Sequence, residues 1–136
     1  MKITSIISFP HFISDNGSLC VYESDKQVPF KICRVFTVSS MKGDSRGNHA
    51  HKKCDQLMVC LSGQIKVTCD NGSNITTQLL KSGENGLFVP SGIWAKQDYL
   101  TDQAVLMVLC DRNFEENDYI RDFNEFKKFV SSQASI

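Results

Sequence analysis

Two histidines separated by a single residue, His49 and His51, are the side chains of this sequence best suited to chemistry. Imidazole has an unperturbed pKa close to neutrality, so it can take up and return a proton under physiological conditions. Residues i and i+2 of a strand lie on the same side, so a strand here would direct both rings into one space. A lone histidine is more often a hydrogen-bonded core residue, but a pair on one face beside Arg46 and Lys52 favours proton transfer.

The spacing around these histidines resembles the first motif of the cupins, G-x5-H-x-H-x4-E-x6-G. The matching residues are Gly43, His49, His51, Gln56 and Gly63. A later stretch, Pro90 to Ala95 (PSGIWA), resembles the second cupin motif, P-x-G-x-x-H. The resemblance implies an all-β fold, the double-stranded β-helix or jelly-roll barrel, with residues 1–136 forming one domain.

Metal-binding cupins take their ligands from the two histidines and the glutamate of the first motif and from the histidine of the second. In this sequence the last two positions are Gln56 and Ala95. A neutral amide is a poor ligand for a transition metal, and a methyl group is none at all. Because two histidines alone provide too few ligands for a secure site, we expect no metal and no other cofactor.

The histidine block is more specific than a bare H-x-H. Residues 46–53 (RGNHAHKK), followed by Gln56, resemble the R-G-x-H-A-H-K…Q signature of the dTDP-4-keto-6-deoxyglucose 3,4-ketoisomerases, the WxcM-like sugar 3,4-ketoisomerases. Three other stretches are similar to the same family: residues 15–19 (DNGSL), 30–35 (FKICRV) and 118–121 (DYIR). The similarity therefore covers nearly the whole chain.

This resemblance implies a metal-free, cytoplasmic homodimer whose subunits exchange an N-terminal strand. It implies conversion of dTDP-4-keto-6-deoxyglucose to a dTDP-3-keto-6-deoxyhexose, ahead of a transaminase that makes a 3-amino sugar for lipopolysaccharide or O-antigen. A base would remove the C3 proton, an enediol would form, and reprotonation at C4 would leave the ketone at C3. In this resemblance His51 matches the base that removes the proton from carbon, and His49 matches the residue that moves the hydroxyl protons. The sequence alone leaves open which histidine has which role.

Seven further positions are expected to contact the substrate: Asn16, Thr37, Arg46, Lys52, Gln56, Trp94 and Ala95. The planar fork of Arg46 suits a pyrophosphate or an oxyanion. Trp94 would either line the mouth of the pocket or fill the end of the barrel. Thr37 stands where the family carries a tyrosine of the proton shuttle, and Asn16 and Ala95 replace residues linked to the product configuration. The galacto or gluco outcome at C4 is therefore not predicted.

Short apolar segments separated by turns dominate the rest of the chain. Alternation in residues 31–38 places Arg34 and Phe36 on one face and Val35 and Thr37 on the other. The continuous apolar run at 56–61 predicts a strand buried on both sides. Further strands are predicted within residues 1–10 and at 64–69, 75–80, 86–90 and 104–110. Strands at this spacing indicate a sandwich or barrel.

Only the C-terminal segment, about residues 122–131, is predicted to be helical. Asp122 and Glu125 resemble a capping box at its start. The apolar stripe that follows is typical of packing and consists of Phe123, Phe126, Phe129 and Val130.

The composition excludes several classes of protein. The 15 basic and 15 acidic residues cancel, and no basic cluster suggests a nucleic acid or a membrane as partner. The first ten residues are typical of a strand rather than of a signal peptide, and the run at 104–110 is too short to span a bilayer. The six cysteines form no C-x-x-C pair, so we expect reduced thiols.

Three alternatives stay open at this point. A metal-dependent cupin oxygenase or isomerase would need the ligands that Gln56 and Ala95 do not supply. A 3,5-epimerase would act on the same 4-keto sugar, but that type is a longer chain and pairs its catalytic histidine with an aspartate. A sugar-nucleotide-binding cupin without turnover, or with altered specificity, is suggested by Asn16, Thr37 and Ala95.

Overall fold

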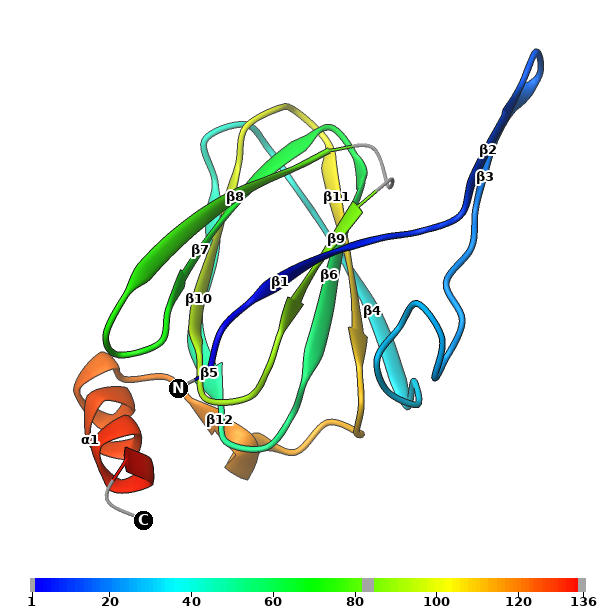
Figure 1. Ribbon diagram of the computed structural model, residues 1–136. Coiled ribbons are helices and arrows are strands. Elements are labelled where there is room, and N and C mark those ends of the chain that lie inside the picture. The colour runs from blue at the N-terminus through cyan, green and yellow to red at the C-terminus, as the bar shows by residue number, and fades with distance from the viewer. Residues whose placement is uncertain (1, 82–84, 135–136) are drawn as a thin grey trace.

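Two five-stranded antiparallel sheets face each other in the computed structural model, which describes residues 2–81 and 85–134 (Figure 1). The first sheet has the order β1 (Ser5–Ser8), β9 (Asn85–Val89), β6 (Gln56–Ser62), β11 (Ala104–Cys110) and β4 (Arg34–Ser40). The second has the order β12 (Tyr119–Ile120), β5 (Ser45–His51), β10 (Trp94–Tyr99), β7 (Gln64–Asp70) and β8 (Ile75–Lys81). The predicted all-β jelly-roll fold is confirmed.

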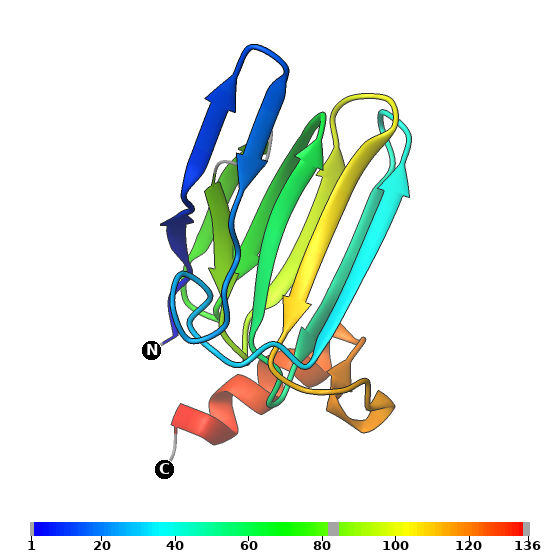
Figure 2. The same ribbon diagram turned by 90° about the vertical axis from the view of Figure 1, so that its right-hand side faces the viewer.

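A two-stranded hairpin near the N-terminus lies outside both sheets. It consists of β2 (His11–Ser14) and β3 (Gly17–Cys20), and it projects away from the barrel (Figures 1 and 2). Three large apolar side chains of this hairpin are exposed, with exposed fractions of 62% for Phe12, 74% for Ile13 and 56% for Leu19. We call β2 and β3 together the N-terminal arm.

The predicted strands are present with shifts of a few residues at their ends, and the predicted faces are correct. Along β4, Arg34 and Phe36 are half-buried while Val35 and Thr37 are exposed. Strand β6 is buried on both sides, because Met58 belongs to the barrel interior and Leu57 to an outer cluster that includes Phe9 and Phe30. Strand β10 was not predicted, since Lys96, Gln97 and Asp98 are three consecutive polar residues that interrupt its apolar pattern.

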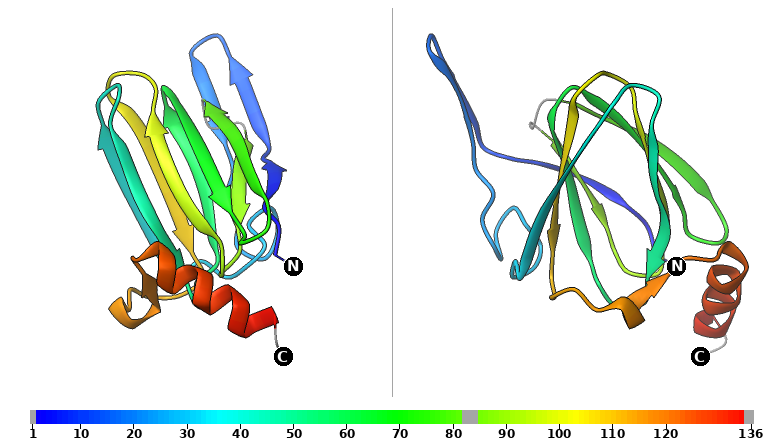
Figure 3. Two further views of the ribbon diagram at one scale, coloured as in Figure 1. Left: turned by 90° about the vertical axis from the view of Figure 1, so that its left-hand side faces the viewer. Right: turned by 180° about the vertical axis from the view of Figure 1, so that it is seen from behind.

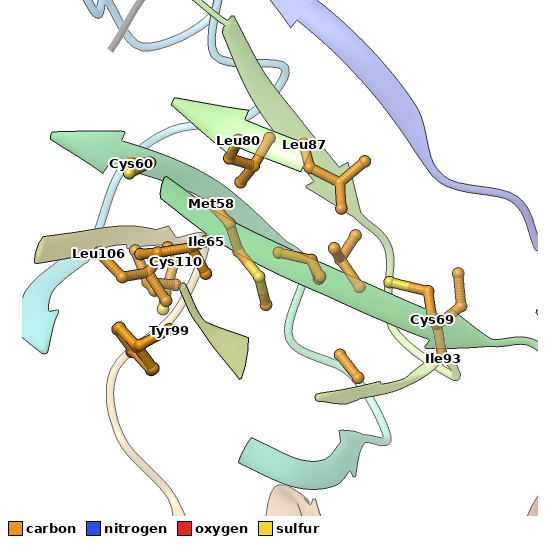
Figure 4. Packing of buried hydrophobic residues seen from close by; sticks show 14 of the residues in the cluster. Met58, Cys60, Ile65, Cys69, Leu80, Leu87, Ile93, Tyr99, Leu106 and Cys110 are labelled. Atoms are coloured by element: carbon orange, nitrogen blue, oxygen red, sulfur yellow. The ribbon is translucent and has the colours of Figure 1, made fainter. Parts of the chain in front are cut away.

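The barrel interior is filled from both sheets (Figure 4). Met58, Leu87 and Leu106 come from the first sheet, and Ile65 and Leu80 from the second; each is at most 3% exposed. Full burial of one such side chain stabilises the fold by about 2 kcal/mol. Within the described ranges, none of the six cysteines forms a disulfide, and four of them are buried as small hydrophobic residues: Cys54, Cys60, Cys69 and Cys110.

A short 3-10 helix, η1 (Glu116–Asp118), precedes β12, and helix α1 (Phe123–Ala134) follows it. Helix α1 lies across the outer side of the second sheet (Figure 3), where Phe126 is fully buried against Ala50 and Ile120. The helix begins one residue later than predicted, because Asp122 precedes it and accepts a hydrogen bond from the Glu125 N–H at 3.0 Å. Across residues 2–81 and 85–134, no helix has the length and hydropathy needed to cross a bilayer.

Candidate active site

A bulge in β5 brings the reactive side chains of this strand to the same side. His49 lies opposite Ala95 of β10, but Gly47 lies opposite Lys96, so Asn48 is the extra residue, with a left-handed φ of 58°. Directly opposed residues of an antiparallel pair share a face. Arg46, opposite the buried Gln97, therefore lies on the same inward face as His49 and His51.

Gly47 is required next to this bulge. A Cβ atom there would lie 2.6 Å from Oε1 of Gln97, and its φ of 89° is in the region that favours glycine. The R-G-x-H spacing of the sequence thus has a structural cause: the glycine and the bulge allow the arginine and the first histidine, three residues apart, to face the same interior.

Asp118 holds His51 in place. The Nδ1 atom of His51 lies 3.0 Å from Oδ2 of Asp118, and both side chains are only 7% exposed. The same carboxylate accepts the backbone N–H groups of Lys53 at 2.7 Å and Cys54 at 3.3 Å. Because a carboxylate only accepts, Nδ1 carries the proton and Nε2 is the acceptor. Within the described part of the chain, this buried Nε2 has no hydrogen-bond partner.

Both imidazoles are held in the neutral form. Burial, together with the neighbouring His51, lowers the pKa of His49 from 6.5 to about 4, against a hydrogen bond with the Gly47 backbone. Burial also lowers the pKa of His51, while its hydrogen bond to Asp118 opposes this shift. At neutral pH each ring therefore has one unprotonated nitrogen that can accept a proton.

Tyr119 covers the histidine pair from β12. The centroid of its ring lies 5.1 Å from that of His49 and 4.3 Å from that of His51. Its hydroxyl oxygen lies 3.4 Å from Nη1 of Arg34, which reaches across from the edge strand β4. The guanidinium of Arg121 stacks on the same ring at 4.3 Å. Two cations therefore lie beside the mouth of the barrel, next to the histidines.

The cavity beneath the histidines is small. It is lined by both imidazoles together with Cys54, Gln56, Val89, Pro90, Ile93 and Ala95. Its volume of about 10 Å³ is enough for about one water molecule. A hexose cannot enter it, and of the two rings that line it His49 is half-buried and His51 is buried.

The residues at the cupin metal positions do not fit a metal. Gln56, in the glutamate position, is 4% exposed and donates its amide N–H to the sulfur of Cys110 at 3.5 Å. Ala95 faces His49 with a methyl group. This set of two imidazoles, one amide and no fourth donor lacks the ligands that a cupin metal centre needs.

The structure brings together only some of the predicted substrate contacts. His49, His51, Gln56 and Ala95 line one cavity, and Arg46 lies on the same face of β5. Lys52 is exposed just after β5, and its backbone N–H bonds to the Asp118 carbonyl at 2.8 Å.

Three residues predicted to contact the substrate lie away from the histidine cavity. Trp94 packs against Phe123 and Phe126 under helix α1, with ring centroids at 5.2 and 5.7 Å, so it neither lines the pocket nor fills the barrel. Thr37 is exposed on the outer face of β4. Asn16 lies at the tip of the N-terminal arm, beside a surface hollow formed by the arm itself.

Sequence reasoning gave no role in the site to Arg34 or Asp118. Arg34 could have been noticed in the sequence, since it is a charged residue on the same predicted face as the apolar Ile32, Phe36 and Val38. Asp118 lies 67 residues from His51, and only the similarity of residues 118–121 to the family marked it.

A family match and a characterised relative each cover nearly the full chain. Residues 2–131 match the family described as FdtA: WxcM-like, C-terminal. The TDP-4-oxo-6-deoxy-alpha-D-glucose-3,4-oxoisomerase of Aneurinibacillus thermoaerophilus is 39% identical over 127 residues, which cover 93% of this chain and 91% of that protein.

Two solved structures have nearly the same fold. A 3,4-ketoisomerase from Helicobacter canadensis is 32% identical, with a TM-score of 0.90 over 94% of this chain and 97% of that one. A histidine-to-asparagine variant of the 3,4-ketoisomerase QdtA from Thermoanaerobacterium thermosaccharolyticum, in complex with TDP-4-keto-6-deoxyglucose, is 27% identical. Its TM-score is 0.91 over 96% of this chain and 95% of that one.

Proposed function

This chain belongs to the FdtA (WxcM-like, C-terminal) family and is a TDP-sugar 3,4-ketoisomerase of deoxysugar biosynthesis, and from that premise we propose how its residues divide the chemistry. The substrate is TDP-4-keto-6-deoxyglucose, and the product is the 3-keto isomer. The observation that carries the proposal is the pair of neutral imidazoles on one face of β5, one of them held by a buried carboxylate.

The reaction moves two protons. The proton on C3 is transferred to C4, and the hydroxyl proton on O3 is transferred to O4, while the double bond to oxygen moves from C4 to C3. One group must therefore exchange a proton with carbon and another must exchange protons with oxygen.

His49 is the group that exchanges a proton with the carbon atoms C3 and C4 of the sugar. It is the more exposed of the two rings, so a hexose outside the small cavity can reach it more readily than His51. With a pKa of about 4 it is unprotonated at neutral pH and ready to accept the C3 proton. The family resemblance implies that His51 removes the proton from carbon, but the deeper burial of His51 favours His49 in that role.

His51 then exchanges the protons on oxygen. Asp118 fixes its Nδ1–H, so Nε2 is directed at the cavity, and the carboxylate stabilises the imidazolium that forms when Nε2 takes a proton. Arg34 stabilises the enediolate oxygen, because it is half-buried and its guanidinium lies beside Tyr119 at the mouth.

The nucleotide binds outside the barrel. The cavity is too small for a sugar nucleotide, while Arg34 and Arg121 lie beside Tyr119 next to the histidines, and Arg46 and Lys52 are exposed. Arg46 remains the residue that we propose for the pyrophosphate, through its planar fork.

We also propose that the active form is a homodimer in which the N-terminal arm packs on the partner. The exposed Phe12, Ile13 and Leu19 support this, since three large apolar side chains on one projecting hairpin are unfavourable in water. Asn16 at its tip would then lie near the partner's substrate. Measurement of the molar mass in solution for the wild type and for a Phe12→Ser, Ile13→Ser variant would test this; a monomeric wild type would contradict it.

The product is a substrate for a transaminase, because a 3-keto sugar can accept an amino group at C3. We propose that this enzyme supplies such a step in the cytoplasm, for 3-amino sugars of lipopolysaccharide or O-antigen. The lack of disulfides among the six cysteines, all in described ranges, fits a reducing compartment.

NMR spectroscopy of the purified protein with TDP-4-keto-6-deoxyglucose tests the activity directly. We expect the carbonyl carbon to move from C4 to C3, and the couplings of the new C4 proton to give the galacto or gluco configuration. Inversion at C5 without a shift of the ketone would identify an epimerase instead. Saturable binding without any turnover would identify a binding protein, and either result would overturn the proposal.

A further inference from the structure

A second set of potential ligands lies directly below the histidine pair. One ring nitrogen of His51, the sulfur of Cys54 and a carboxylate oxygen of Asp118 lie within 4.8 Å of one another, and all three side chains are buried. This set shares only His51 with the cupin metal positions. We propose that it is an inhibitory site for a zinc ion, which binds His51, Cys54 and Asp118 and thereby stops the isomerase.

The geometry is close to what zinc requires. Zinc bonds of about 2.0–2.3 Å to nitrogen, oxygen and sulfur in a tetrahedral arrangement place the ligand atoms about 3.3–3.6 Å apart. The Nδ1 atom of His51 and Oδ2 of Asp118 already lie 3.0 Å apart. Each remaining pair lies within 4.8 Å, so small side-chain movements complete the three-ligand set.

The surroundings also favour a metal ion over an empty site. Cys54 is 5% exposed and Asp118 is 7% exposed, so a bound ion would be shielded from water. A doubly charged cation beside one thiolate and one carboxylate leaves no net charge in this buried place.

Binding changes the protonation of the site in a defined way. The Cys54 thiol loses its proton to solvent when the sulfur bonds to zinc. The His51 proton moves from Nδ1 to Nε2, which is now without a partner. With Nδ1 bound and Nε2 protonated, His51 cannot accept a proton from the sugar. The inhibition, but not the binding, rests on the role proposed for His51.

The purified wild-type protein, titrated with Zn²⁺ and separately with Cd²⁺, tests this site. We expect one ion per chain, release of about one proton per ion, a cadmium–thiolate absorption band, and loss of isomerase activity that a chelator reverses. Cys54→Ala should weaken binding at least 100-fold. Cys69→Ala is the matched control, because Cys69 is also buried but lies on β7 outside this set, and it should bind like the wild type.

Two outcomes overturn the proposal: no stoichiometric binding by the wild type, or equal binding by Cys54→Ala and the wild type. Activity measured without added metal tests the isomerase function separately. A protein that binds zinc but lacks activity would therefore contradict the function and not the metal site.

Discussion

Strands β5, β6, β10 and β11 run from one end of the barrel to the other, and the chemistry of their inward side chains changes along the way. At one end three of them, β6, β10 and β11, contribute Cys60, Tyr99 and Leu106, which pack with Ile65 of β7 in the buried interior; we call this the apolar end. At the other end the same four strands carry His51, Gln56, Ala95 and Cys110. Together with His49, Asp118, Tyr119 and Arg34, these residues form the histidine end.

Apart from β10, the apolar end is built from strands whose apolar patterns can be recognised in the sequence one strand at a time. The histidine end depends on a bulge, a cross-strand glycine contact and a carboxylate from a distant segment. The difference suggests that the apolar end determines the stability of the fold and the histidine end determines its activity. Four predictions test whether stability and activity can be changed separately at the two ends.

The largest effect is expected from the histidines. His49→Asn and His51→Asn should each lower kcat about 1000-fold, because each removes a group that transfers a proton in the reaction. Steady-state assays with a thermal unfolding curve check this, and Tm should change by only a few degrees. A variant that keeps one-tenth of the activity would show that its ring is not needed for the chemistry.

At the apolar end we expect the opposite pattern. Leu106 is 2% exposed, and Leu106→Ala should lower the free energy of unfolding by about 3 kcal/mol through the cavity it leaves. Chemical denaturation measures this loss. Under conditions where the variant is fully folded, its kcat should equal that of the wild type; a large fall in kcat would mean that the two ends are not separable.

Asp118→Asn should lower kcat about 100-fold with little change in KM, because the amide no longer stabilises a charged His51. Asp111→Asn is the matched control, since Asp111 also accepts a backbone N–H, that of Asp55 at 3.1 Å, but does not contact the histidines. If kcat falls by the same factor in both variants, Asp118 acts only through its hydrogen bonds to the backbone N–H groups of Lys53 and Cys54 and not through His51.

The smallest effect is a dependence of stability on pH. Because burial lowers the pKa of His49 to about 4, the unfolded chain binds a proton below pH 6.5 that the folded chain does not bind. The free energy of unfolding should therefore fall by about 1 kcal/mol between about pH 7 and pH 5.5 on account of this ring. His49→Asn should remove that part of the decline; an unchanged pH profile would mean that the ring is not desolvated.

The same contrast explains how much could be predicted from the sequence. Alternation in residues 31–38 and the apolar run at 56–61 were sufficient to predict β4 and β6 with their faces, because burial in a sheet follows a period of two. The H-x-H block identified His49 and His51 for the same reason. The same alternation predicted Thr37 on the face opposite Arg34 and Phe36, and that face is exposed; the substrate contact expected of Thr37 from the family pattern stays a prediction.

The surroundings of other residues could not be predicted from local sequence patterns. Trp94 alternates with Ala95 along β10, but nothing in that strand tells which side helix α1 will cover, and the helix covers Trp94. Asp118 is joined to His51 only by the fold, since β12 pairs with β5 at Tyr119 and His51. The N-terminal arm has apolar residues but no interior to bury them in this chain.

The measurement that tests the central claim most directly is hydrogen exchange into TDP-4-keto-6-deoxyglucose in deuterated water, compared between the wild type, His49→Asn and His51→Asn. We predict that the wild type places deuterium on carbon as the ketone moves and that His49→Asn exchanges no carbon-bound hydrogen. His51→Asn should still exchange the C3 hydrogen while the ketone stays at C4. Exchange at C3 that survives in His49→Asn and is lost in His51→Asn would contradict the assignment of the carbon base to His49.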